Sequence, residues 1–153
     1  MLFRSGVFVL KRLEDAERDG DSIFGVLVGF GLSNDVEGKL LAPSSEGQLR
    51  AMRAAYREAQ WDPADVDLIE CHATGTPLGD AVEYHSMLAL RSETSAPGRR
   101  CVIGSAKSNV GHLLTAAGSA GLTKVLFALR EATLPPTANF DQPAESIDLN
   151  PGP

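Results

Sequence analysis

The sequence predicts a layered α/β fold, on two observations: the order of its apolar segments, and its length and composition. Short apolar segments rich in β-branched residues alternate with longer segments whose apolar residues recur at helical spacing. Such alternation is typical of a sheet covered by helices. The chain has 153 residues, 43% of them hydrophobic and 22% charged, which is enough for one domain with a core.

The N-terminal part is predicted to hold two strands around a short helical turn. Residues 6–13 and 22–32 are apolar and β-branched, and we expect them to pair antiparallel. Residues 14–21 between them read as a helical turn that Gly20 ends. A loop over residues 33–44 then leads to a helix over 44–60, with Gln48 three residues after Ser45 as a capping signal.

The second part repeats a strand, loop and helix. Residues 66–71 and 101–107 are predicted to be buried strands, and residues 79–91 and 111–131 are predicted to be helices. The last helix is rich in Ala, Gly and Ser, so we expect another backbone to approach it closely. The remaining residues, 132–153, are proline-rich and predicted to be extended.

The composition excludes several classes of protein. A net charge of −6 and a pI of about 5.0 argue against a nucleic-acid partner. No apolar run approaches the roughly 18–20 residues of a membrane span, and the N-terminus does not resemble a signal peptide. Cys71 and Cys101 lie in apolar stretches without a C-x-x-C motif, which favours reduced, buried thiols in a cytoplasmic protein.

Two loops share one plan and carry two of the three histidines. In "LIECHATGTPLGD" and "VIGSAKSNVGH" a buried strand runs into a polar, glycine-bearing loop that enters a helix. Ligands of α/β sheets bind at the carboxyl ends of strands, so His72 and His112 are candidate site residues. His85 lies inside an amphipathic helix and is predicted to be structural. The histidine spacings fit no zinc site, and we expect no metal.

Cys71 and His72 are adjacent but are not predicted to act together. Consecutive side chains on a strand point to opposite faces, whereas a nucleophile and its base must meet within hydrogen-bond reach. Cys71 is therefore interpreted as a small core residue. His112 is predicted to precede a long helix, whose N-terminus should keep its imidazole neutral and able to donate to a developing oxyanion. Lys107 on the same loop would add positive potential.

The chain resembles the C-terminal half of a β-ketoacyl synthase, the condensing domain of polyketide and fatty acid synthases, which has a thiolase-like fold. "HATGTPLGD" is similar to that family's first histidine motif and "KSNVGH" to its second, and three further stretches look like family segments: "GVFVLKRLEDAERDGD", "APSSEGQLRA" and "LREATLPPTANF". The resemblance covers nearly all of residues 1–153. It implies one partial ketosynthase domain, about half of a duplicated βαβαβ architecture, truncated at both ends.

The resemblance also implies a reaction and partners. Family members take an acyl group onto a cysteine and condense it, with decarboxylation, with a malonyl unit on an acyl carrier protein. No cofactor is bound directly, because the carrier protein delivers the phosphopantetheine; the parent domain would be a homodimer. By motif, His72 and His112 assist decarboxylation and Lys107 supports them. The pantetheine channel would be lined by Thr74, Thr76 and Asn109.

Several features depart from the family pattern. Ala73 and Val36 stand where glycine is expected, and Gly121 stands where some relatives carry a glutamate that partners the lysine. Neither cysteine has the context of the family nucleophile, so the isolated chain is expected to be inactive and to need the N-terminal half of the domain. Two alternatives stay open: a non-condensing ketosynthase-like partner, and a pantetheine-binding fragment without activity.

Overall fold

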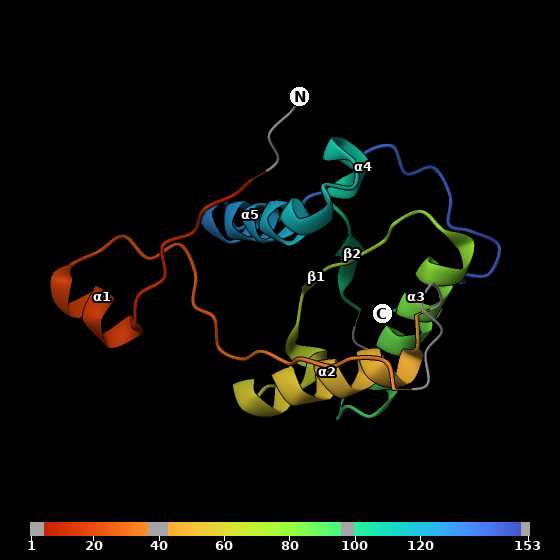
Figure 1. The fold of residues 1–153 in the computed structure, drawn as a ribbon, viewed down its shortest axis with the longest axis horizontal. Coiled ribbons are helices and arrows are strands. Elements are labelled where there is room, and N and C mark those ends of the chain that lie inside the picture. The colour runs from red at the N-terminus through yellow and green to blue at the C-terminus, as the bar shows by residue number, and fades with distance from the viewer. Residues whose placement is uncertain (1–4, 37–42, 96–99, 151–153) are drawn as a thin grey trace.

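The protein is described here from a computed structural model, which places residues 5–36, 43–95 and 100–150. Two short strands, β1 (Leu68–Glu70) and β2 (Val102–Gly104), form a parallel sheet in which Glu70 lies opposite Gly104. In Figure 1 the strands lie between α5 above and α2 below, which gives the layered α/β arrangement that the sequence predicts. Part of the predicted loop over 33–44, and part of the segment 92–100 that joins the predicted helix 79–91 to the predicted strand 101–107, lie outside the described residues.

The central helices confirm the sequence-based expectations. α2 (Ser45–Ala59) and α3 (Pro77–Ser92) pack on each other, and α3 connects the two strands as a crossover helix. Both helices present apolar side chains at helical spacing to a small core under the sheet. That core is built around Cys71, Tyr84 and Met87, and partly buried Met52 and Ile103 pack against it.

The N-terminal segment differs from the prediction. Residues 6–12 and 22–32 form no strand, although α1 (Leu13–Asp19) does end at Gly20 in the left-handed conformation. The segment instead crosses helices: a Cβ at Gly31 would lie 1.8 Å from the carbonyl oxygen of Ala51 in α2. A helix has already bonded its backbone groups internally, so it offers no partner for a strand ladder. Val7 and Val9 remain more than 90% exposed.

The last predicted helix begins later than expected. A single 3-10 turn, η2 (Leu114–Ala116), and then α5 (Ala117–Arg130) replace the continuous helix predicted over 111–131. A one-turn helix, α4 (Lys107–Val110), precedes them and begins at the last residue of the strand predicted over 101–107. Gly111 has φ +72° and Leu114 has φ +51°, and these left-handed residues interrupt the helical path. A second 3-10 turn, η1 (Pro63–Asp65), precedes β1.

The C-terminal tail is irregular, as the sequence predicts, but it is not detached. Its Ile147 and Leu149 pack against the core, and the Tyr84 hydroxyl on α3 donates to the carbonyl oxygen of Asp148. No helix in the described part of the chain is long and apolar enough to cross a membrane.

Candidate active site

The first histidine loop is held by a carboxylate from the helix that follows it. β1 ends at Glu70, and the backbone then turns through Ala73 at φ +31° and Gly75 at φ +78°. Glu83 on α3 accepts the His72 N–H at 2.6 Å through Oε1 and the Ala73 N–H at 2.8 Å through Oε2. Two charge-assisted bonds from one side chain fix this turn, even though a left-handed alanine is unfavourable.

The backbone of the second histidine loop makes a hydrogen bond to the His112 ring. The Leu114 N–H donates to His112 Nδ1 at 3.0 Å, which places the ring hydrogen of a neutral imidazole on Nε2. The long helix α5 begins only at Ala117, so it does not start directly after His112 as predicted, and the single turn η2 lies between them. A backbone N–H of its own loop makes Nδ1 an acceptor instead.

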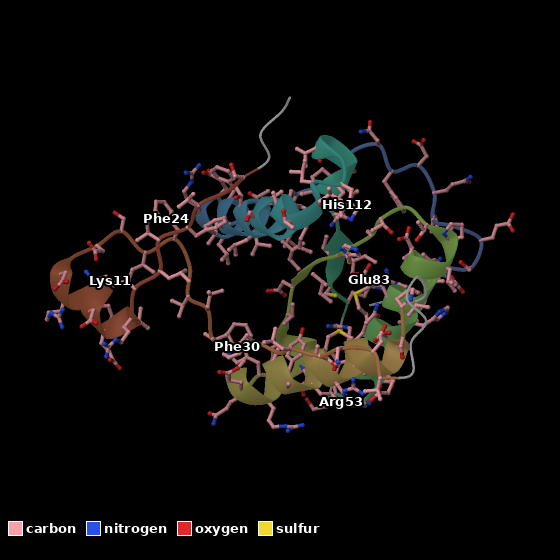
Figure 2. The ribbon with its side chains drawn as sticks, in the orientation of Figure 1. Lys11, Phe24, Phe30, Arg53, Glu83 and His112 are labelled. Atoms are coloured by element: carbon pink, nitrogen blue, oxygen red, sulfur yellow. The ribbon has the colours of Figure 1, made fainter. Side chains whose placement is uncertain are left out.

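The structure brings His72 and His112 together. Their ring centroids are 5.5 Å apart with the planes at 90°, and both side chains are exposed at the carboxyl ends of the parallel strands. Figure 2 shows Glu83 on α3 and His112 beyond β2, so two separate elements supply the support and the second ring. Two imidazoles at this spacing can both make a hydrogen bond to one small polar group, each from its own side. His85 lies exposed on α3, outside the pair.

The other candidate residues lie on the two histidine loops that carry this pair. Thr74 and Thr76 Oγ1 atoms are 3.2 Å apart in the His72 loop. Lys107 is the first residue of α4 and partly buried, whereas Asn109 is exposed. Asn109 borders an apolar pocket of about 570 Å³ along α5, whose lining includes neither histidine. Thr74 and Thr76 do not line this pocket.

Neither cysteine has the environment of a nucleophile. Cys71 is 7% exposed, its Sγ lies 3.9 Å from Met87 Sδ, and burial raises its pKa to about 12, with the Glu83 carboxylate adding to the effect. Its interpretation as a core residue is confirmed. Cys101 is only half-buried, contrary to the prediction, because it borders a pocket of about 360 Å³; burial still raises its pKa. The part of the chain that the structure describes holds no cluster of three potential metal ligands.

Sequence reasoning missed three charged residues that shape the site. Glu83 lies one helical turn after Asp80, on the side of α3 that faces the loop, but its two backbone partners appear only in the folded chain. Glu70 in an otherwise apolar strand was the available signal for a buried partner. That partner is Lys124, whose Nζ lies 2.8 Å from Glu70 Oε2.

Comparison with known proteins decides the family. The sequence model of "Beta-ketoacyl synthase, C-terminal domain" matches residues 24–141. The chain belongs to the β-ketoacyl synthase family. The fold is accordingly the thiolase-like fold of ketosynthases, of which these residues form a partial α/β unit.

Its ketosynthase relatives are much longer than this chain. This chain is 47% identical over 150 residues to the PKS-NRPS hybrid synthetase acdB of Aspergillus candidus, and the match covers 94% of this chain and 6% of that protein. It is 41% identical over 149 residues to the erythronolide synthase EryA3 of Saccharopolyspora erythraea, covering 97% and 5%. The ketosynthase from module 6 of the bacillaene synthase of Bacillus subtilis superposes with a TM-score of 0.86 at 38% identity, covering 94% of this chain and 26% of that one.

Proposed function

We propose that these residues form the C-terminal part of a ketosynthase domain that carries out decarboxylative Claisen condensation. In that reaction an acyl group is first transferred to a cysteine thiol. A malonyl thioester then loses CO₂, its enolate carbon attacks the acyl carbonyl, and the cysteine thiolate leaves. The observation that carries the proposal is the His72–His112 pair, 5.5 Å apart at the strand ends.

The two imidazoles would stabilise the enolate formed on decarboxylation. The Leu114 N–H bond to Nδ1 leaves the His112 hydrogen on Nε2, so His112 acts as a donor to developing negative charge. His72 would donate a hydrogen bond to the enolate from the other loop, whose backbone the Glu83 carboxylate holds through the His72 and Ala73 N–H groups. Lys107 at the start of α4 would add positive potential nearby.

The nucleophile and the second half of the domain would come from another segment of the full-length protein. The raised pKa of Cys71 keeps its thiol protonated near neutral pH, so it does not suit acyl transfer. The substrates would arrive on the phosphopantetheine arm of an acyl carrier protein. Thr74, Thr76 and Asn109 are proposed to bond the amides of that arm, and the complete domain would work as a homodimer.

The two half-reactions separate this role from a general effect on folding. In a complete ketosynthase containing these residues, His112→Ala should lower decarboxylation of a labelled malonyl thioester by about 10²–10³-fold, as expected for removing one preorganised donor. Transfer of a labelled acyl group to the cysteine develops no enolate and should change much less. His85→Ala, on the exposed face of α3, is the matched control. Equal losses in both half-reactions after His112→Ala would contradict this role.

A further inference from the structure

Glu70 joins the two histidine loops through its carboxylate. It is the last residue of β1 and lies two positions before His72. Its Oε1 accepts the Ala106 N–H at 2.6 Å, and Ala106 directly precedes Lys107 and α4. One side chain therefore connects the strand that leads into the first loop with the backbone that leads into the second.

Lys124 balances this carboxylate from a third element. Its Nζ lies 2.8 Å from Glu70 Oε2, and the side chains of Lys124 and Glu70 are 16% and 14% exposed. Neither atom makes a well-aligned hydrogen bond within the described residues, so the contact is an ion pair. Lys124 Nζ also lies 3.0 Å from the position of a Cβ at Gly104, the last residue of β2. The ammonium thus sits over the ends of both strands.

Gly121 leaves the space that Glu70 occupies. A Cβ at position 121 would lie 2.9 Å from Glu70 Cγ and 3.4 Å from Oε1. Gly121 is buried in the middle of α5, one helical turn before Lys124. The absence of a side chain there lets the carboxylate lie flat on α5 and reach Ala106 and Lys124 at once.

We propose that Glu70 and Lys124 form a positioning unit that sets the separation of His72 and His112, with Gly121 as the surface on which the unit rests. The inference rests on the proposed function, because it assigns a role in the same decarboxylation step. Neither side chain needs to touch substrate. They act by holding β1, the start of α4 and α5 in one arrangement.

A displaced loop should be costly for this step. Misplacing a reacting group by about 1 Å can lower a rate by about 10²-fold. Acyl transfer to the cysteine does not depend on the enolate donors, so a positioning defect should separate the two half-reactions. A general loss of folded protein would lower both equally.

Gly121→Ala tests the arrangement without removing any charge. Alanine favours a helix more than glycine does, so α5 itself should not be weakened. The new methyl group must move Glu70 by several tenths of an ångström, since carbon atoms pack at about 3.5–4.0 Å. We expect decarboxylation in the complete ketosynthase to fall about tenfold with acylation within about twofold.

Gly118→Ala is the matched control, because a Cβ at Gly118 in the same helix meets nothing within 4 Å among the described residues. It should leave both half-reactions within about twofold of the parent. If Gly121→Ala behaves like Gly118→Ala, or lowers both half-reactions by one factor, the positioning role is overturned.

A second set of variants tests the ion pair. Lys124→Met leaves the Glu70 carboxylate buried without its counter-charge and should lower decarboxylation selectively, by about tenfold or more. In Glu70→Gln/Lys124→Met the introduced amide oxygen can still accept the Ala106 N–H and no buried charge is left. We expect this double variant to recover to within about threefold of the parent. A double variant no better than Lys124→Met would refute the coupling.

The outcome also separates this inference from the function on which it rests. If the parent protein decarboxylates malonyl thioesters and the Gly121 and Lys124 variants keep its ratio of half-reactions, only the positioning unit is wrong. If the parent shows no decarboxylation, the proposed function fails, whatever these variants do.

Discussion

Glu83→Gln should loosen the first histidine loop by a predictable amount. The Glu83 carboxylate accepts both the His72 and Ala73 N–H groups, through separate oxygens. Glutamine has the same shape but a single oxygen, so its NH₂ group faces one of these donors. The loss of one charge-assisted bond and the weakening of the other amount to about 2 kcal/mol.

The appropriate assay is hydrogen exchange of the peptide covering residues 70–76, measured by mass spectrometry in the complete ketosynthase. A loss of about 2 kcal/mol in the free energy of local opening corresponds to about 30-fold faster exchange of the His72 and Ala73 amides. The effect should stay local, because residues outside the loop keep their own bonds.

Glu58→Gln provides the matched control. Glu58 Oε2 accepts the Phe30 N–H at 2.9 Å, and the amide oxygen of glutamine can replace that single acceptor. It should cost less than about 1 kcal/mol. Unchanged exchange at residues 70–76 in Glu83→Gln, or a change no larger than the Glu58→Gln effect at Phe30, would refute the reasoning that two carboxylate oxygens hold this turn.

Two further predictions follow from Cys71 and Thr76. The Cys71 thiol has an ordinary pKa of 9.0, and burial raises the pKa to about 12 in the folded chain, so the unfolded chain releases this proton first. The contribution of Cys71 to the free energy of unfolding should therefore be complete below pH 9 and fall as the pH rises towards 12. Cys71→Ala should reduce this slope when denaturation is measured as a function of pH. Thr76 stands at the N-cap of α3, where its side chain makes no cap bond to the described residues, so Thr76→Val should change the free energy of unfolding by less than about 0.5 kcal/mol. The same variant should weaken the use of carrier-bound substrates more than that of short free thioesters, because a hydroxyl bond to the pantetheine arm is lost. Equal losses on both substrates in a steady-state comparison would exclude that contact.

The parts of the fold that local pattern encodes were predictable. α2 and α3 follow from apolar spacing, and β1 and β2 from short apolar runs bounded by polar loops. The N-terminal strands were not, because a β-branched run shows that a segment is extended and apolar but not which partner it finds. Residues 6–12 and 22–32 lie over helices in the described chain, and no ladder forms there.

In the candidate site too, local motifs predicted some residues, whereas others depend on tertiary contacts. The motifs indicated His72 and His112, and the structure places the two rings 5.5 Å apart. Their supports depend on tertiary contacts over long sequence separations: Glu70 with Ala106 and Lys124, and Glu83 with the His72 loop. The predicted continuous helix failed because the positive φ of Leu114 cannot be inferred from a leucine, which rarely adopts it.

The contacts of the C-terminal tail have a consequence for the choice of fusion junctions in this chain. Asn139 Nδ2 donates to the Ser108 carbonyl oxygen at 3.0 Å, inside α4, and Tyr84 on α3 donates to Asp148. A fusion junction placed directly after α5, at Arg130, would replace both contacts with those of a foreign sequence, so α4 and α3 would each lose one hydrogen bond to the tail. Junctions beyond Leu149 would keep the tail contacts together with α3, α4 and the two histidine loops.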